Sequence, residues 1–253
     1  MWRRASERGI VCPVPGLESS TDGQRIPERL RVGINFGNPL LASRDPASGT
    51  PSGIAIDVAR ELGRRLGAAL DIVGYSSANL MADAVRAAAW DVAFLATDPA
   101  RAGDIAFTSP YLEIEATYLV REESPVRTVS EVDRDGARIA VSDRSAYDLF
   151  LTRTIARAAL VRAPSVDASV DLFFAQRLDA LAGLTPLLAA VADTHPGTRV
   201  VSGRFTEIRQ AIGLPHGRSI AELEAFVRDV RSSGFVAAAI ERHGIRGVVV
   251  PTS

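Results

Sequence analysis

The stretch FLATDPAR, residues 94–101, predicts an apolar strand that runs directly into the start of a helix. Asp98 or Thr97 can cap this helix, and Pro99 suits its first position. Arg101 would then lie in the first turn, where the helix dipole favours an acidic side chain. An arginine beside free backbone N–H groups forms a site for a carboxylate or phosphate. Arg101 is therefore a candidate anion-binding residue, and the alternative is an exposed arginine paired with a surface acid.

Apolar strands alternate with amphipathic helices on both sides of this stretch. On the N-terminal side, strands are predicted at 30–35, 70–73 and 92–96, with helices at 57–66 and 80–88 between them. On the C-terminal side, strands are predicted at 116–120, 138–141, 180–183, 199–201 and 210–214. Helices are predicted at 145–157, 166–176 and 186–192. A further helix is predicted to start at a capping box of Ser219 and Glu222, and a last helix to end at about residue 243. This alternation predicts an α/β fold of two units with parallel strands, and a ligand-binding cleft between the units.

Composition excludes several classes of function. The 253 residues carry a net charge of −1, which gives no broad basic field for nucleic acid. The chain has no lysine, so it lacks a Walker A lysine, a pyridoxal Schiff base and any catalytic lysine. The single Cys12 excludes an internal disulfide, and the three histidines are too far apart to suggest a metal site. We expect neither a cofactor nor a metal.

The N-terminal residues 1–26 lack the apolar run that a signal peptide needs, and we expect them to be disordered. No stretch is long enough to span a membrane. Taken literally, these features predict a cytoplasmic chain, although a signal sequence upstream of Met1 would leave the same pattern.

Two motifs give the chain a family resemblance. The first is GIAIDVA at 53–59, followed by Leu62, Leu66 and Gly67. The second runs from WDVA at 90–93 through Arg101 to FTSPY at 107–111. In order and spacing they resemble the periplasmic solute-binding proteins of the amino-acid class, extracellular solute-binding family 3, over residues 30–244.

The resemblance implies a two-lobed type II periplasmic-binding-protein-like fold with a hinge and an interlobe cleft. We expect lobe 1 to comprise 27–112 and 213–250, and lobe 2 to comprise 113–212. The chain would cross between the lobes twice, and the strands would not form one continuous sheet.

The resemblance also assigns candidate ligand-binding residues. Arg101 matches the arginine that grips the α-carboxylate of the ligand, and Ser145 matches the second residue of a G-[ST] pair, with Arg144 in place of the glycine. The alternative for Ser145 is a plain helix cap, because Asp148 follows three residues later. Leu184 occupies the position of the amine-binding aspartate. The ligand is therefore predicted to carry a carboxylate without an α-amino group.

The remaining candidates lie around the predicted cleft. Asn35 and Asn38 offer amide groups, although asparagine is also an ordinary turn residue. Thr97 and Asp98 flank Arg101, and Thr185 follows Leu184. Glu115, like Glu113, can hold an amine or act as a solvated hinge charge. Phe36 or Tyr75 can replace the aromatic residues of the family, which are absent at Ala78 and Asn38, or can simply pack in the core.

The resemblance implies a monomeric, non-enzymatic binding protein that delivers a small anionic solute to the membrane permease of an ABC transporter in the periplasm. One alternative is an enzyme on the same scaffold, similar to cyclohexadienyl dehydratases, with Glu115 or Asp98 as the acid. Another is a ligand-sensing module, which would suit a cytoplasmic chain.

Overall fold

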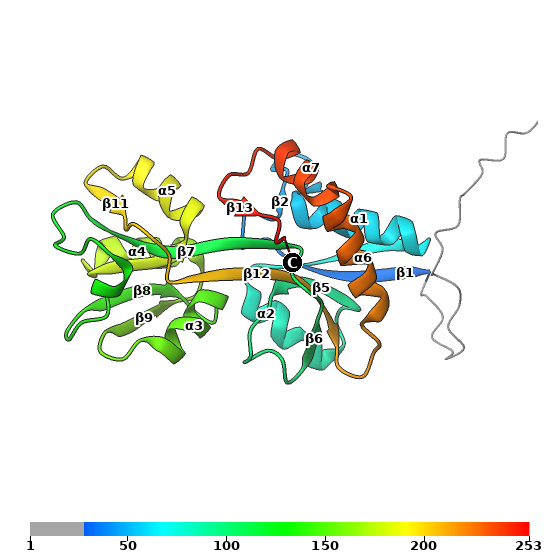
Figure 1. Ribbon diagram of the computed structural model, residues 1–253, viewed down its shortest axis with the longest axis horizontal. Coiled ribbons are helices and arrows are strands. Elements are labelled where there is room, and N and C mark those ends of the chain that lie inside the picture. The colour runs from blue at the N-terminus through cyan, green and yellow to red at the C-terminus, as the bar shows by residue number, and fades with distance from the viewer. Residues whose placement is uncertain (1–27, 253) are drawn as a thin grey trace, which may run out of the picture.

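A computed structural model describes residues 28–252. Two α/β lobes lie at the ends of an elongated molecule, and two long strands run through both of them (Figure 1). These strands are β7 (Leu112–Arg121) and β12 (Thr206–Pro215), which pair antiparallel. The predicted segment 1–26 lies outside the described residues.

The first lobe is built on three parallel strands in the order β4 (Ala69–Tyr75), β1 (Arg29–Asn35) and β5 (Val92–Ala96). Strand β12 continues this sheet antiparallel to β5, and β6 (Ile105–Phe107) pairs with β12. The other elements are β2 (Ser43–Arg44), β3 (Pro51–Ser52), α1 (Ile54–Leu66), α2 (Ala78–Asp83), a 3₁₀ turn (Ala84–Ala87), α6 (Ala221–Ser232) and α7 (Phe235–Arg242).

The second lobe repeats this plan. Strands β9 (Ala159–Ala163), β8 (Arg138–Ser142) and β10 (Ala180–Leu184) are parallel, and β10 pairs antiparallel with β7. The other elements are a 3₁₀ turn (Val129–Glu131), α3 (Ala146–Thr154), α4 (Val166–Ala175), α5 (Thr185–Thr194) and β11 (Thr198–Val200). The chain then returns along β12 to the first lobe and ends with β13 (Val248–Val249), which pairs with β7.

The expectation of separate sheets is wrong. Strand β12 pairs with β5 through residues 210–213 and with β7 through 206–210, so backbone hydrogen bonds continue from one lobe into the other. The reason is that both connections are long strands and not loops. The predicted lobe boundaries at 112/113 and 212/213 fall at the start of β7 and within β12, and they stay a prediction.

Helix α1 explains why the first sequence motif begins and ends with glycine. Gly53 precedes the helix at φ 125°, and a Cβ there would clash with the backbone of Leu41. Gly67 ends the helix in the left-handed conformation at φ 66°. Between them, Val58 and Leu62 are buried against the sheet. The motif therefore specifies one amphipathic helix with both ends fixed.

The helix predicted after Asp98 is not formed. Residues 99–104 make a single turn, in which the N–H groups of Arg101 and Ala102 donate to the Asp98 carbonyl at 3.0 and 3.2 Å. Asp98 does cap this turn, because its Oδ1 accepts from the Ala100 N–H at 2.8 Å. The chain must reach β6 by Ile105, which leaves no room for a helix. Arg101 therefore does not face a helix dipole.

Other local predictions were also wrong or incomplete. Helix α6 begins at Ala221 after Ile220, without a side-chain cap, so Ser219 and Glu222 do not form a capping box. Strands β2, β3, β6, β9 and β13 were not predicted. Within residues 28–252, no helix is both long and apolar enough to cross a membrane.

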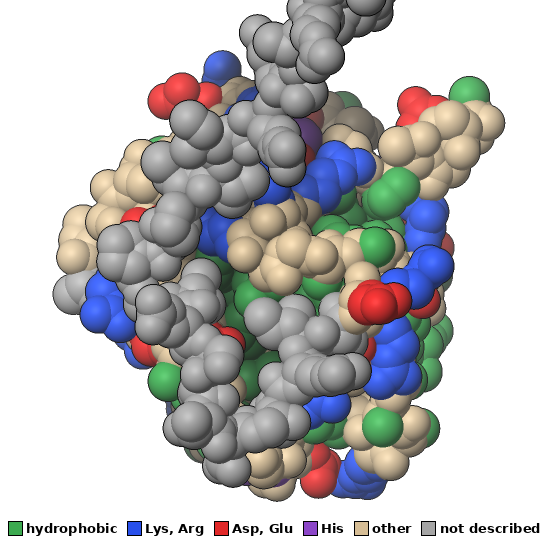
Figure 2. Space-filling view, turned by 90° about the vertical axis from the view of Figure 1, so that its right-hand side faces the viewer, with side chains coloured by type: hydrophobic (Ala, Val, Ile, Leu, Met, Phe, Trp, Pro, Cys, Tyr) green, Lys and Arg blue, Asp and Glu red, His purple; other side chains and the backbone are tan. Residues whose placement is uncertain are grey.

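The surface at the end of the first lobe carries both signs of charge. Figure 2 shows arginine side chains and acidic side chains interspersed over this end of the molecule. This agrees with the net charge of −1 and with the absence of a broad basic field in the sequence.

Candidate functional site

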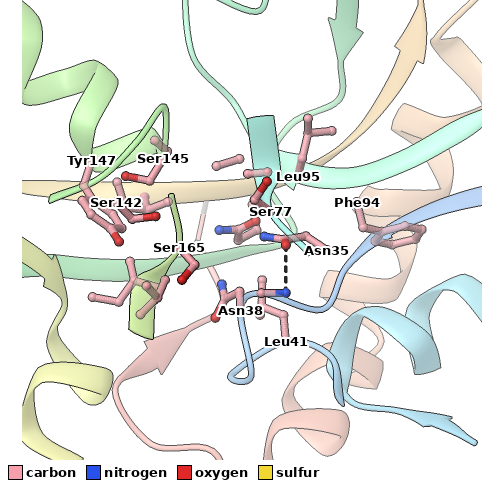
Figure 3. Close-up of a pocket in the computed structure, with 18 of the residues that line it drawn as sticks. Asn35, Asn38, Leu41, Ser77, Phe94, Leu95, Ser142, Ser145, Tyr147 and Ser165 are labelled. Atoms are coloured by element: carbon pink, nitrogen blue, oxygen red, sulfur yellow. Dashed lines mark hydrogen bonds between the residues drawn. The ribbon is translucent and has the colours of Figure 1, made fainter. Parts of the chain in front are cut away.

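A cavity of about 70 Å³ lies between the two lobes, next to the long strands. Its walls come from the carboxyl ends of β1, β5, β8 and β10, where open α/β sheets bind ligands, and from the first residues of α3 and α4. Figure 3 shows side chains from both lobes pointing into it. Asn35, Asn38, Leu41, Ser77 and Phe94 come from the first lobe, and Ser142, Ser145, Tyr147 and Ser165 come from the second.

Arg101 is a buried cation in the lining of this cavity, with an exposed fraction of 6%. Its Nη1 donates to the carbonyl of Ala96 at 2.8 Å, and its Nη2 donates to the carbonyl of Arg144, in the second lobe, at 3.1 Å. Burial lowers the pKa of Arg101 to about 10, although Asp98 partly offsets this, so the group stays charged at neutral pH. Among residues 28–252, no carboxylate lies within ion-pair distance of its guanidinium.

Ser145 lines the same cavity and also caps α3. Its Oγ accepts a hydrogen bond from the N–H of Asp148 at 3.1 Å, so the helix cap that was considered as an alternative is present. Because the oxygen is the acceptor, the hydroxyl hydrogen stays able to donate to a ligand. The two interpretations of Ser145 are therefore compatible.

Asn35 and Asn38 lie in the tight loop that follows β1. The Oδ1 of Asn35 accepts from the N–H of Gly37 at 3.0 Å, and that of Asn38 accepts from the N–H of Leu40 at 3.3 Å. A Cβ at Gly37 would clash with the carbonyl of Ser76, so the loop packs too closely for any other residue. The loop holds both asparagines in the cavity wall.

Two arginine–aspartate ion pairs join the lobes on either side of Arg101. Arg153 of α3 donates to Oδ1 and Oδ2 of Asp98 at 3.0 and 2.8 Å. Arg144 donates to Asp83 of α2 at 2.7 and 2.6 Å, and its hydrogen bonds lower the pKa of the Asp83 carboxyl. Both pairs are bidentate, which is a strong geometry for this contact. The two lobes are therefore in direct contact at these two places.

Thr97 and Asp98 do not line the cavity. They lie instead in a neighbouring groove of about 340 Å³, together with Arg153 and Phe150. The Asp98 side chain is only 4% exposed and is fully used by Arg153 and by the turn before Arg101. Asp98 therefore supports the position of Arg101 and joins the lobes.

Glu115 and Thr185 also lie outside the cavity. Glu115 is half exposed on β7 and forms an ion pair with Arg204 at 2.9 Å. Thr185 begins α5, and its buried Oγ1 has no hydrogen-bond partner within residues 28–252. Leu184, just before it, does reach the cavity.

The other residues weighed as amine or aromatic contacts are placed elsewhere too. Glu113 pairs with Arg209 at 3.2 Å, and Phe36 lies under the guanidinium of Arg44 at 4.2 Å. Tyr75 packs beside the cluster around Met81. None of these side chains lines the cavity.

The sequence reasoning missed seven polar lining residues, which are Ser76, Ser77, Ser142, Asp143, Tyr147, Ser165 and Gln210. Asp143 directly follows β8, so its place at the end of a parallel strand could have suggested it. Tyr147 is in the first turn of α3, and burial raises its pKa to about 12, which keeps its hydroxyl neutral. Gln210 lies on β12 and carried no local signal.

The cavity combines one buried cation with several hydroxyl and amide groups. Asp143 is the one carboxylate in its lining, and its Oδ1 lies 3.8 Å from the Arg162 guanidinium. Across residues 28–252, no three His, Cys, Asp or Glu side chains come together as a metal site would require. The arrangement suits a small molecule with a negative group.

Comparisons with known proteins agree with the two-lobed form. The sequence model of the bacterial extracellular solute-binding proteins, family 3, matches residues 30–244. No curated protein sequence matches the chain.

Among solved structures, the solute receptor for L-cysteine of Neisseria gonorrhoeae is 21% identical, with a TM-score of 0.74 over 87% of this chain and 92% of its own. A mutant of ArgBP from T. maritima is 24% identical, with a TM-score of 0.68 over 85% and 94%. The ancestral amino acid-binding protein AncCDT-1, a precursor of cyclohexadienyl dehydratase, is 18% identical, with a TM-score of 0.71 over 85% and 94%. At these identities the likeness shows the type II periplasmic-binding-protein-like fold.

Proposed function

Because the chain belongs to the bacterial extracellular solute-binding proteins, family 3, we propose that it is the ligand-binding component of an ABC-type importer. In this proposal the two lobes close over a small solute that carries a carboxylate, either amino-acid-like or an organic acid. The protein acts as a monomer in the periplasm and delivers the solute to a membrane permease.

The observation that carries this proposal is that Arg101 is a buried cation without a carboxylate in direct contact. A charged group that is 6% exposed is stabilised by a directly contacting counter-charge, and no carboxylate of residues 28–252 lies within ion-pair distance of it. Two backbone carbonyls, one from each lobe, fix the orientation of its guanidinium. A ligand carboxylate in the cavity would neutralise this cation and accept a charge-assisted, bidentate hydrogen bond.

Closure and binding are then linked by the same residue. The Arg101 guanidinium of the first lobe donates to the Arg144 carbonyl of the second lobe, so this contact depends on how the lobes are placed. The hydroxyl of Ser145 and the start of α3 arrive with that lobe, so a carboxylate gains its full set of donors in the closed form alone. A ligand that binds one state better shifts the population toward it.

No observation favours the alternative of an enzyme acting through Asp98 or Glu115. Asp98 is held by Arg153 and Glu115 by Arg204, both outside the cavity. The alternative of a ligand-sensing module rests on the same cavity and gains no separate support.

The proposal is tested by identifying what the purified full chain carries. We expect mass spectrometry of small molecules released by denaturation to detect a carboxylate-bearing solute. An Arg101→Met variant, prepared in parallel, is expected to lack it, whereas Arg204→Met, a surface arginine outside the cavity, keeps it. Equal recovery from the Arg101 variant, or recovery only of solutes without a carboxylate, would contradict the proposal.

A further inference from the structure

Four polar side chains of the cavity share one property, which is that their acceptor oxygens are already engaged by the protein. This donor set consists of Asn35, Asn38, Ser145 and Ser165, and all four line the cavity. Two of them come from the first lobe and two from the second, so a ligand meets hydrogen-bond donors on both sides.

The asparagine amides are fixed in one orientation by their partners. The N–H groups of Gly37 and Leu40 are donors, so each amide must present its oxygen to the loop. The Nδ2 group of each amide therefore points away from these contacts. Within the described part of the chain, neither Nδ2 donates a hydrogen bond to another residue. Two NH₂ groups thus remain for a ligand.

The two serines are placed in the same way by helix capping. Ser145 accepts from the N–H of Asp148 at the start of α3, and Ser165 accepts from the N–H of Ala168 at the start of α4, both at 3.1 Å. Each hydroxyl keeps a hydrogen to donate, which in Ser145 can also reach the neighbouring hydroxyl of Tyr147. Figure 3 shows Ser165 and Asn38 reaching toward each other from opposite lobes.

Gln210 adds a polar group at the floor of the cavity. It lies where β12 changes partner, opposite Ala96 of β5 and Leu112 of β7, and it is only 5% exposed. For its side-chain amide, no hydrogen-bond partner exists among residues 28–252. A buried amide can donate and accept, so it suits a hydroxyl, carbonyl or carboxylate group of a ligand.

Carboxylate acceptors for an ammonium group are scarce by comparison. Leu184 offers none, and Glu113 and Glu115 lie outside the cavity. Asp143 is the remaining carboxylate, and its side chain is 38% exposed and near the Arg162 guanidinium. Its charge is therefore already met by solvent and by an arginine.

We propose that the cavity selects an organic acid with a second oxygen function, namely a carbonyl, a hydroxyl or a second carboxylate, in place of an ammonium group. Asn35, Asn38 and Ser165 donate to this second function, and Gln210 completes its hydrogen bonds. The inference rests on the proposed function, because Arg101 is assigned there to the carboxylate.

A panel of acids tests the selection. The full chain, freed of ligand by unfolding and refolding, is titrated by calorimetry with unsubstituted, 2-hydroxy, 2-oxo and 2-amino acids and with α,ω-dicarboxylates, each of two to five carbons. We expect the tightest acid to be oxygenated, and to bind at least tenfold more tightly than the unsubstituted and 2-amino acids of the same length.

An isosteric substitution is expected to change the affinity in opposite directions for the two kinds of ligand. Asn38→Asp keeps the oxygen that accepts from Leu40 and replaces the Nδ2 donor by a charged acceptor. The affinity for the tightest oxygenated acid is expected to fall at least tenfold at pH 7. The affinity for a ligand held through an ammonium group would rise instead. Asn35→Asp, which keeps the contact to Gly37, is a second variant with the same expected sign.

Asn79→Asp is the matched control. Asn79 accepts from the hydroxyl of Ser77, an aspartate can do the same, and its side chain does not line the cavity. The affinities of Asn79→Asp for the acids are expected to stay within twofold of those of the parent chain. This control shows whether a loss of affinity in Asn38→Asp comes from the lost donor in the cavity or merely from an added negative charge.

The outcomes distinguish this inference from the proposed function. If a 2-amino acid binds most tightly, or if Asn38→Asp strengthens binding, the second oxygen function is wrong while the binding of a carboxylate stands. Equal affinities for oxygenated and unsubstituted acids would also overturn it. If no acid of the panel binds, both this inference and the proposed function fail.

Discussion

Arg144 holds a backbone conformation that glycine adopts more easily, with φ at 50°. A non-glycine residue in this region costs about 1 kcal/mol. The ion pair of the Arg144 side chain with Asp83 offsets part of this cost. In this conformation the Arg144 carbonyl accepts a hydrogen bond from Arg101. Both partners of the ion pair are about half exposed, so the pair contributes about 0–1 kcal/mol.

Two substitutions at Arg144 separate strain from charge. Arg144→Gly loses the ion pair but relieves the strain, so the free energy of unfolding is expected to change by less than about 1 kcal/mol. Arg144→Ala loses the ion pair and keeps the strain, and should be less stable than Arg144→Gly by about 1 kcal/mol. Urea unfolding measures both. An alanine variant as stable as the glycine variant would show that the conformation is not strained.

Several residues of the cavity lining can be predicted from the sequence. Arg101, Ser145, Asn35 and Asn38 were found from motif positions and loop composition, and all four line the cavity. Their roles in binding stay predictions. Asp98 was expected beside the ligand, but its carboxylate is consumed by Arg153, a residue 55 positions away. A contact over that distance leaves no trace in local sequence.

Helix α3 is the element that links closure of the lobes to the cavity. Its first turn carries Ser145 and Tyr147 into the lining, and its last turn carries Arg153 to Asp98 of the first lobe. The Asp98 side chain is 4% exposed, so the loss of Arg153 would leave a nearly buried carboxylate without its partner.

Arg153→Met is therefore expected to favour the open form. Without ligand, the radius of gyration from small-angle X-ray scattering should increase, and ligand affinity should fall by about three- to thirtyfold because closure costs more. Arg157→Met, an exposed arginine just beyond α3, is the control and should change neither quantity. An unchanged radius and affinity in Arg153→Met would mean that the ion pair does not hold the lobes together.

Helix α1 offers a test of pH dependence. Hydrogen bonds from Arg64, together with Arg65, lower the pKa of Glu61 to about 2. Because the folded pKa lies below the unfolded value of about 4.3, the contribution to stability is present above pH 4.3 and is lost as pH falls toward 2. Glu61→Gln should destabilise the protein more at pH 7 than at pH 3, as urea unfolding would measure. An equal effect at both pH values would contradict the assignment.

Elements with a strong periodic pattern were predicted well, and short elements were not. The buried run of β5 and the apolar face of α1 are each specified by their own residues. Strands β6 and β13 have three and two residues, and each exists only through pairing with a long strand from elsewhere in the chain. The turn after Asp98 has the start signals of a helix, but the position of β6 ends it early.

At the scale of the whole molecule, the alternation of strands and helices was enough to predict two α/β units with a cleft. It could not predict that β7 and β12 join both units into one sheet, because strand pairing depends on partners nearly 100 residues apart. Gln210 enters the cavity through that pairing, so no local pattern of residues could predict its position.

The central claim is that Arg101 anchors a ligand carboxylate and is not a structural residue. A bidentate, desolvated contact of this kind is worth roughly 2–5 kcal/mol. Calorimetric titration of the parent chain and of Arg101→Met, with the tightest-binding acid, measures its loss directly. We expect the variant to bind at least about thirtyfold more weakly. The ligand-free variant should keep its free energy of unfolding or gain slightly, because a buried cation has been removed. If Arg101→Met instead lost several kcal/mol of stability and kept its affinity, Arg101 would be structural and the site would be wrongly placed.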